Sequence, residues 1–349
     1  MKKIIVLIAG LLGPSLYAKL PQKVLICGVC KNVAARLPYT IKIMEKIGAL
    51  FADYRVIIYE NNSTDDTPVL LQRWQASNSR VCAISEQLSQ SYLESVIINR
   101  VKNNKKVQLF VPEAIARARN IVLQHAMSDK YQGFDYVIWM DMDFNREPAY
   151  EGFIEVFSSN QEWDAVFAYG IDPHQKFWDW YALRDQDCPL GSELLGNDWW
   201  YLPKTLKLTV HDAWYPVISA FGGCGIYKKS SIKDCWYSAL VTQDLGQLSA
   251  KIIKELPEHQ IIKKYYADAK KLKSVMQLGP ATSNLSEVTD AHIGFVIPAL
   301  HSELIWRMSS FVYKYPSVCE HVPFHASMIM RGHDKLFINP RLIFRYNAD

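Results

Sequence analysis

The sequence predicts an α/β fold with a mostly parallel central sheet. From residue 23 onward, short apolar runs alternate with stretches of helical periodicity. Strands and helices that alternate in this way form parallel sheets covered by helices on both faces. Polar clusters follow two of the expected strands, and such sheets bind ligands at the carboxyl ends of their strands. We therefore expect the functional side chains directly after the strands.

The expected elements follow in chain order. The runs that predict strands are Val24–Val29, Arg55–Tyr59, Val81–Ser85 and Tyr136–Met140. The stretches that predict helices are Ala34–Ala52, Thr67–Gln75 and Pro112–Met127. Residues 172–215 are rich in tryptophan and weakly periodic, which predicts a long connection over the ligand edge. Residues 220–345 mix short strands and helices and are expected to complete the same domain, which we place at residues 22–345.

The N-terminal segment has the pattern of a secretory signal peptide. Lys2 and Lys3 precede an apolar run, Ile4–Leu12, and the small residue Ala18 follows. The run is short for a membrane span, which needs about 20 residues. We predict a signal peptide over residues 1–18, with a short membrane anchor or a native first element as alternatives. Export, or membrane association through this segment only, is expected, and a cytoplasmic location is the alternative.

Composition excludes some classes of protein. The chain of 349 residues is 49% hydrophobic and 21% charged, as globular domains are. Its net charge of +4 and the lack of a basic cluster with interleaved aromatic residues predict no nucleic-acid partner. Cys27 and Cys30 form a CxxC, but no second CxxC completes a zinc site. Buried free thiols are therefore expected, and a few disulfides if the chain is exported.

Two acidic residues form the sharpest motif. Asp141 and Asp143 flank one methionine directly after the apolar run Tyr136–Met140. Carboxylates are hard oxygen ligands that suit Mn²⁺ or Mg²⁺, and two of them this close repel each other unless a cation or proton intervenes. Such a cation would hold a diphosphate and neutralise its charge as it leaves. We therefore predict a metal site at this pair, with a solvated strand–loop junction as the alternative.

Two further polar segments lie near expected strands. Glu60 ends the run Arg55–Tyr59, where its carboxylate can accept hydrogen bonds from a base or ribose; helix capping by the residues after it is the alternative. Arg117 and Arg119 lie two apart on an expected helix and so point to different faces. We expect one arginine to reach a phosphate and the other to be solvated, with a plain surface helix as the alternative.

Three segments in order carry a family resemblance. Tyr59–Thr67, Ala118–Asn120 and Tyr136–Asp143 resemble the motifs of GT-A glycosyltransferases, and more closely those of the fungal α-mannosyltransferases of mannan and capsule synthesis and their bacterial and viral relatives. The resemblance covers residues 24–170 and is looser beyond. No nucleophile elbow, P-loop or dinucleotide-binding glycine fingerprint occurs in the sequence, which weighs against hydrolases, kinases and dehydrogenases.

Two later segments fit the same resemblance. Gly222 and Gly223 lie in a run that looks like the glycine-bearing strand lining the sugar cleft of such enzymes; a bulge or tight turn is the alternative. GT-A enzymes often complete the metal site with a late histidine, and we assign His321 to this role, with His325 as the second choice.

The resemblance implies a GT-A fold and a metal-dependent transferase with Mn²⁺ or Mg²⁺ as cofactor. It would move a hexose, with mannose favoured, from a GDP- or UDP-sugar to a glycan, protein or lipid acceptor, with retention. Arg119 would support the diphosphate or the metal loop. The residues implied to hold the nucleoside are Glu60, Asn61, Asn62, Ser63 and Asp65.

Alternatives remain open at this point. An inverting enzyme would need a carboxylate base, for which Asp212 and Glu320 are the candidates. A nucleotidyltransferase would also pair an acidic metal site with an α/β sheet, although the expected Gly-rich basic loop after the first strand is poorly formed. An inactive sugar-binding or effector protein is the second rival, and an intact acidic pair argues against it.

Overall fold

The computed structural model describes residues 19–97, 100–103, 106–109, 111–190, 206–264 and 318–346. The predicted signal peptide and part of the tryptophan-rich connection lie outside these residues. The described strands of the main sheet are β1 (Leu20–Cys30), β2 (Phe51–Asn61), β3 (Val81–Glu86), β6 (Tyr136–Met140), β7 (Ala165–Ile171), β8 (Tyr215–Pro216), β9 (Cys224–Lys228) and β10 (Leu336–Arg345). A separate antiparallel pair consists of β4 (Arg100–Asn103) and β5 (Lys106–Leu109).

The sheet has the order β3-β2-β1-β6-β9-β7-β10-β8. Neighbours from β3 to β6 pair in parallel, and so do β7 and β10. β9 is antiparallel to both β6 and β7, so β7 and β10 point the same way as β6. This confirms the predicted α/β class with a mostly parallel sheet, and it adds antiparallel β9 and β8. The carboxyl ends of β1, β2, β3, β6, β7 and β10 therefore share one edge of the sheet, where β9 begins.

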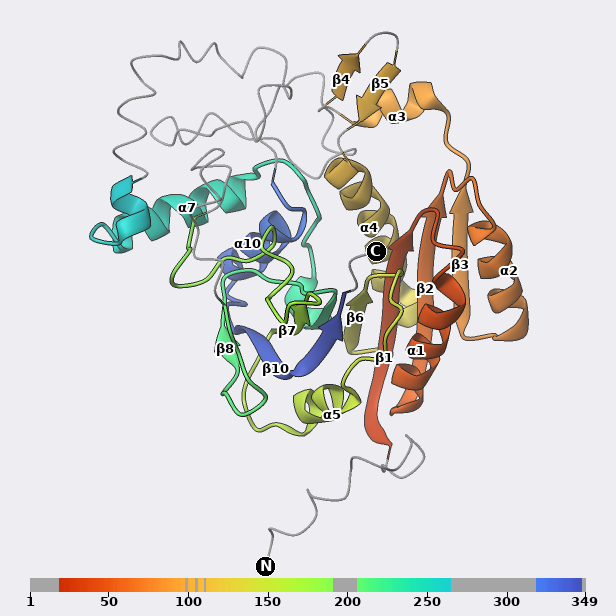
Figure 1. Cartoon of the computed structure of the whole chain (residues 1–349), viewed down its shortest axis with the longest axis horizontal. Helices are drawn as coiled ribbons and strands as arrows, with labels where there is room; N and C mark the ends of the chain where they lie inside the picture. The colour runs from red at the N-terminus through yellow and green to blue at the C-terminus, as the bar shows by residue number, and fades with distance from the viewer. Residues whose placement is uncertain are drawn as a thin grey trace, which may run out of the picture.

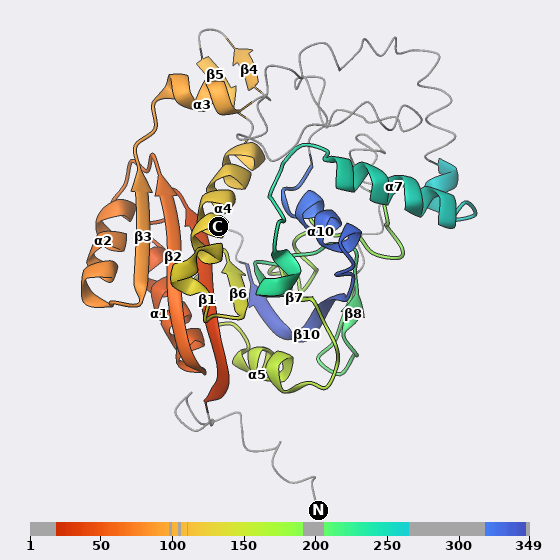
Figure 2. The same ribbon diagram turned by 180° about the vertical axis from the view of Figure 1, so that it is seen from behind.

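Helices cover both faces of the sheet. α1 and α2 lie over one face of β1–β3, and α4 lies over the other face (Figures 1 and 2). The described helices are α1 (Leu37–Ala49), α2 (Thr67–Ser77), α3 (Gln90–Val96), α4 (Val111–Met127), α5 (Tyr150–Ser158), α7 (Gln243–Glu255) and α10 (His321–Met330), with short 3-10 helices η2 (Asp129–Tyr131) and η4 (Lys229–Ile232).

The sheet separates two apolar cores, and β1 contributes to both. Leu25 and Cys27 pack with the α4 side, whereas Val24 and Ile26 pack with the α1 side, and all four side chains are fully buried. A strand buried on both faces needs a continuous apolar run, which is the pattern that the sequence shows here. All seven cysteines are free, as expected, and five of them are buried.

Some predicted boundaries shift. α1 begins at Leu37, later than expected, with a proline in its first turn, where the missing amide proton costs nothing. It ends at Ala49 because Phe51 already belongs to β2. Within the described ranges, no helix is long and apolar enough to cross a membrane.

Candidate active site

The acidic loop after β6 is held from one side by α1. The Thr40 hydroxyl, which is fully buried, lies 3.1 Å from the carbonyl oxygen of Met142 and 3.2 Å from that of Phe144, and it can donate to either. Arg36, the residue before α1, donates from Nη1 to the Asp143 carbonyl at 3.4 Å. Three consecutive carbonyl groups of the loop thus face donors at the start of one helix. The Asp143 side chain itself remains 46% exposed.

Asp141 is held by groups from three other parts of the chain. The Tyr346 hydroxyl donates to its Oδ2 at 2.7 Å, and Arg119 Nη2 lies 3.7 Å from its Oδ1. Its backbone amide donates to the Gly223 carbonyl at 3.0 Å. Burial raises the pKa of Asp141 to about 7; Arg119 opposes this shift and the Asp143 carboxylate adds to it. The surroundings therefore compensate the negative charge of Asp141 only in part.

Arg119 is the buried cation of the site. Its side chain is 4% exposed, and Nε donates to Glu320 Oε1 at 3.1 Å. The guanidinium lies over the rings of Phe221, Trp139 and Tyr237, at 4.9 to 5.6 Å from their centroids. Its Nη1 is buried and has no hydrogen-bond partner in the described part of the chain. Arg119 thus links two carboxylates inside an aromatic enclosure.

Arg117 points to the other side of α4, as the spacing predicts. It donates to the Tyr59 hydroxyl at 2.7 Å and pairs with Glu86 at 3.2 Å, and the Tyr92 hydroxyl lies at 3.4 Å. The expectation that one of the two arginines is solvated is wrong, because this guanidinium is occupied by partners from β2, β3 and α3. It ties α4 to the strand ends beside the turn after β2.

Glu60 shapes the turn after β2. Its Oε1 accepts a hydrogen bond from the Ser63 amide at 2.7 Å, and its Oε2 accepts one from the Ser85 hydroxyl at 2.5 Å. The residue is 1% exposed. Both oxygens are therefore engaged within the protein, and the predicted contact with a base or ribose stays a prediction that would need this turn to open.

The rest of the turn is also hydrogen bonded internally. Asn62 adopts a positive φ of 54°, donates to the Leu88 carbonyl at 2.7 Å and accepts from the Leu88 amide at 3.2 Å. Asn61 donates to the Asn62 side chain at 2.9 Å. Asp65 accepts from the amide of Thr67, the first residue of α2, at 3.0 Å, whereas the N-cap residue Asp66 makes no side-chain capping hydrogen bond. The turn is a preformed surface whose role toward a nucleoside remains a prediction.

Gly222 and Gly223 form the turn that starts β9. Both have positive φ, 62° and 86°. A Cβ on Gly222 would lie 2.2 Å from the Ala168 carbonyl oxygen, and one on Gly223 would lie 2.1 Å from the Tyr346 hydroxyl. The glycines thus allow the protein's own segments to approach Asp141, in line with the turn alternative; a contact with the sugar stays a prediction.

The late histidines differ from each other. His325 is fully buried, and its two ring nitrogens are hydrogen bonded with Ser219 and Tyr227, each at 2.9 Å. His321 stacks on Phe221 at 4.0 Å, and neither of its ring nitrogens has a hydrogen-bond partner within the described residues. Burial lowers the pKa of His321 well below its usual value, so its imidazole is neutral, the form that binds metals.

The predicted three-residue ligand set is not gathered. The described ranges contain no group of three or more His, Cys, Asp or Glu side chains placed to bind a metal. The contacts from His321 toward Asp141 run through Glu320, whose Oε1 is 3.6 Å from His321 Nε2, and then through Arg119. A ligand role for His321 therefore stays a prediction. The Asp141 and Asp143 carboxylates do fit Mn²⁺ or Mg²⁺ by chemistry, because both offer hard oxygens, the Asp143 side chain is 46% exposed and the charge of Asp141 is only partly compensated.

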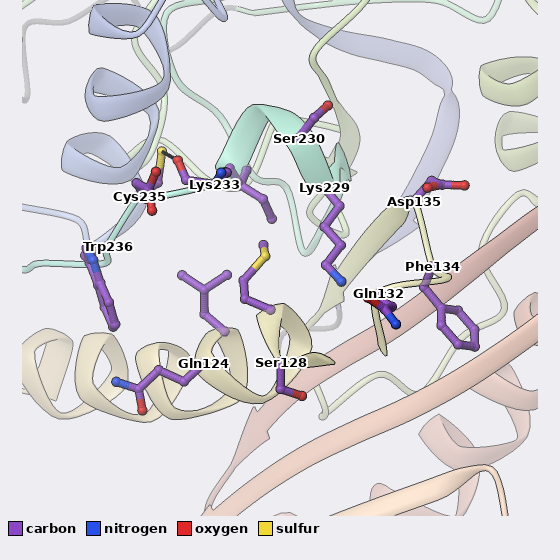
Figure 3. Close-up of a pocket in the computed structure, with 14 residues that line it drawn as sticks. Gln124, Ser128, Gln132, Phe134, Asp135, Lys229, Ser230, Lys233, Cys235 and Trp236 are labelled. Atoms are coloured by element: carbon purple, nitrogen blue, oxygen red, sulfur yellow. Dashed lines mark hydrogen bonds between the residues drawn. The ribbon is translucent and has the colours of Figure 1, made fainter. Parts of the chain in front are cut away.

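A separate pocket lies at the opposite end of β6. Its volume is about 650 Å³, and it is lined by the end of α4, by η4 and the residues after it, and by residues just before β6, among them Gln132, Lys229 and Trp236 (Figure 3). These residues precede β6 or follow β9, whereas Asp141 follows β6. The pocket therefore does not belong to the acidic site.

The structure adds residues that the sequence reasoning did not assign. Thr40 and Tyr346 contact the acidic loop, and Asp179 accepts a hydrogen bond from the Gly222 amide at 3.1 Å. Trp178 stacks on Tyr346 with centroids 5.4 Å apart. The tryptophan-rich composition of residues 172–215 pointed to this connection as a whole, but no local pattern singled out Thr40 or Tyr346.

No model of a known protein family matches the chain. No curated protein matches it either. The comparison with specific fungal α-mannosyltransferases therefore stays a resemblance of sequence motifs.

Solved structures with a similar arrangement were found at low identity. The mannosyltransferase PcManGT from Pyrobaculum calidifontis, in complex with GDP-Man and Mn²⁺, is 14% identical with a TM-score of 0.35, over 69% of this chain and 53% of its own. GalNAc-T7 with UDP, GalNAc and Mn²⁺ is 12% identical with a TM-score of 0.41, over 95% of this chain and 45% of its own. S. aureus TarS in complex with UDP-GlcNAc is 12% identical with a TM-score of 0.35, over 62% and 48%. The chain thus spans about half the length of these proteins.

Proposed function

We propose that the chain is a metal-dependent glycosyltransferase of the GT-A type that transfers a hexose from a GDP- or UDP-sugar to an acceptor hydroxyl. The observation that carries this proposal is the position of Asp141 and Asp143. They follow a buried central strand, at the sheet edge where the carboxyl ends of six strands meet. This is where α/β sheets bind nucleotides.

Each part of the edge has a chemical task in this proposal. Asp141 and Asp143 would hold Mn²⁺ or Mg²⁺, which supplies positive charge against the diphosphate when bound. Thr40 and the backbone of Gly223 hold the acidic loop in place. Arg119 compensates Asp141 and Glu320 within the low-dielectric interior. The turn after β2 lies on the β1 side of β6 and would receive the nucleoside.

Retention is the stereochemical outcome that we propose, as the sequence resemblance implies. The bond between the anomeric carbon and the diphosphate oxygen breaks, the acceptor oxygen bonds to the same face, and the acceptor proton passes to the leaving diphosphate. Both candidate bases of an inverting reaction are already engaged. Glu320 is buried and paired with Arg119, and hydrogen bonds from Thr209 lower the pKa of Asp212.

The test is a calorimetric and turnover screen with Mn²⁺ against GDP-mannose, UDP-glucose, UDP-galactose and UDP-N-acetylglucosamine. The expected result is binding of one donor and release of its nucleotide, both lost with chelator and with Asp143→Ala. The matched control, Asp129→Ala, removes an exposed carboxylate from η2 and is expected to behave as wild type. Donor binding without any transfer would favour the inactive sugar-binding rival, and equal turnover by Asp143→Ala with chelator would contradict the proposal.

A further inference from the structure

We infer that Trp178, backed by Tyr346, is the stacking platform for a hexopyranose of the acceptor, so that the acceptor is a glycan or glycoside. This inference rests on the proposed function, and it concerns residues that neither the motifs nor the metal site assign. Its basis is the exposed indole of Trp178, which stacks on the partly buried ring of Tyr346 directly beside the acidic loop.

Tyr346 is fixed on several sides. Its amide donates to the Ile171 carbonyl at 2.9 Å, its hydroxyl donates to Asp141 at 2.7 Å, and its ring packs against Phe144 at 5.6 Å. These contacts hold the ring at the carboxyl ends of β7 and β10. Tyr346 therefore offers a rigid support whose position is tied to the Asp141 carboxylate.

Trp178 lies on this support. Its indole stacks on the Tyr346 ring with centroids 5.4 Å apart and planes 22° apart. Its amide donates to the Gly170 carbonyl at 2.9 Å, and the next residue, Asp179, accepts from the Gly222 amide at 3.1 Å. The backbone around the indole is thus anchored to β7 and to the turn before β9, yet 49% of Trp178 is exposed. An aromatic ring that is held in place and half open can take a second flat apolar surface.

The ligand that fits is a sugar ring, because the C–H face of a pyranose is apolar and its rim carries hydroxyl groups. A nucleobase could also stack on an aromatic ring, but the sheet order argues for the sugar. The turn after β2 lies on one side of β6, whereas Trp178 and Tyr346 follow β7 and β10 on the other side. A donor that spans from that turn to Asp141 leaves the Trp178 side for the acceptor.

The test measures donor and acceptor separately. Methyl hexosides of mannose, glucose and galactose serve as acceptors and, without donor, as ligands in a direct calorimetric titration. Trp178→Ala is expected to weaken hexoside affinity and raise the acceptor KM roughly tenfold, the size of one lost aromatic stacking contact. Nucleotide affinity, donor KM and donor hydrolysis are expected to stay unchanged.

Matched variants separate the platform from general damage. Tyr346→Phe keeps the ring and is expected to retain wild-type hexoside affinity, whereas Tyr346→Ala removes the support and is expected to weaken it as Trp178→Ala does. Tyr181→Ala, which shortens another exposed aromatic residue of the same connection, is the control. The inference is overturned if Trp178→Ala binds hexosides as tightly as the wild type. It is also overturned if Trp178→Ala loses affinity for the nucleotide or the donor instead of the hexoside. A wild type that binds hexosides through Trp178 but no nucleotide sugar would contradict the proposed function alone.

Discussion

Replacing Arg119 by methionine is expected to destabilise the fold far more than most single substitutions. The arginine side chain is 4% exposed and that of its partner Glu320 is 9% exposed, so water does not take the place of the lost guanidinium. Among the described residues, the contacts left to the Glu320 oxygens would be His321, at 3.6 Å, and the Cys319 thiol, at 3.8 Å. Leaving one partner of a buried ion pair uncompensated costs about 3–5 kcal/mol. Methionine retains much of the apolar volume between the surrounding rings, so this loss is mainly electrostatic.

The assay is equilibrium unfolding in urea, with the midpoint compared at unchanged m. The double variant Arg119→Met/Glu320→Gln removes the stranded charge and is expected to recover about 1–3 kcal/mol relative to Arg119→Met. Arg117→Met is the matched control on the same helix, because the ion pair of Arg117 with Glu86 is partly exposed. This substitution is expected to lower the free energy of unfolding by about 1 kcal/mol. The reasoning is refuted if Arg119→Met costs no more than Arg117→Met, or if adding Glu320→Gln brings no recovery.

Three further predictions concern groups around the acidic loop. Thr40→Val keeps the shape but removes the hydroxyl that faces two loop carbonyls, and should cost about 1–3 kcal/mol in urea unfolding; an unchanged midpoint would show that the hydroxyl does not hold the loop. Gly223→Ala places a Cβ 2.1 Å from the Tyr346 hydroxyl and should lower the free energy of unfolding more than Gly332→Ala does, because Gly332 has a similar φ of 88° but open space around it. Equal losses of unfolding free energy would mean that backbone strain is the whole cause. Burial lowers the pKa of His325 to about 3, below the unfolded value near 6.5, so its contribution to stability is full above pH 6.5 and is lost as pH falls toward 3. Between pH 7 and pH 5 this amounts to about 2 kcal/mol, and His325→Gln should reduce the wild-type loss by that amount; an identical pH dependence in both proteins would contradict the shift.

The parts of the fold that the sequence predicted well are those specified by local pattern. β6 has the bounds that its apolar run predicted, Tyr136–Met140, because a strand buried on both faces is apolar throughout. β7 is equally buried along Ala165–Ile171, but its alanines and glycine have weak strand propensity, and it was not predicted. α1 was predicted too long, since helical periodicity alone does not register the proline in the first turn or the strand that starts at Phe51.

The acidic pair was recognisable from sequence because both carboxylates lie within three residues of one another after a strand. Its side-chain hydrogen-bond partner Tyr346 was not, because this bond joins positions far apart in the chain. Tyr346 is 205 residues away from Asp141. The partners of Glu60 are Ser63 in the turn and Ser85 in β3, and they engage the carboxylate within the protein. Residue type and spacing suggest which groups can act, whereas tertiary contacts decide which of them remain open.

The antiparallel strand β9 explains why these partners meet. Inserted between β6 and β7, it pairs Met140 with Cys224 and so places Gly223 beside Asp141, where the carbonyl of one accepts from the amide of the other. Because β9 is antiparallel to both neighbours, β7 and β10 return to the direction of β6, and Tyr346 emerges from β10 at the same edge. A Cβ on Gly223 would meet the Tyr346 hydroxyl. The glycine whose carbonyl binds the Asp141 amide therefore also leaves room for the Tyr346 hydroxyl, which binds the Asp141 carboxylate. The geometry of the acidic site therefore depends on a mixed sheet, and a purely parallel one would separate these residues.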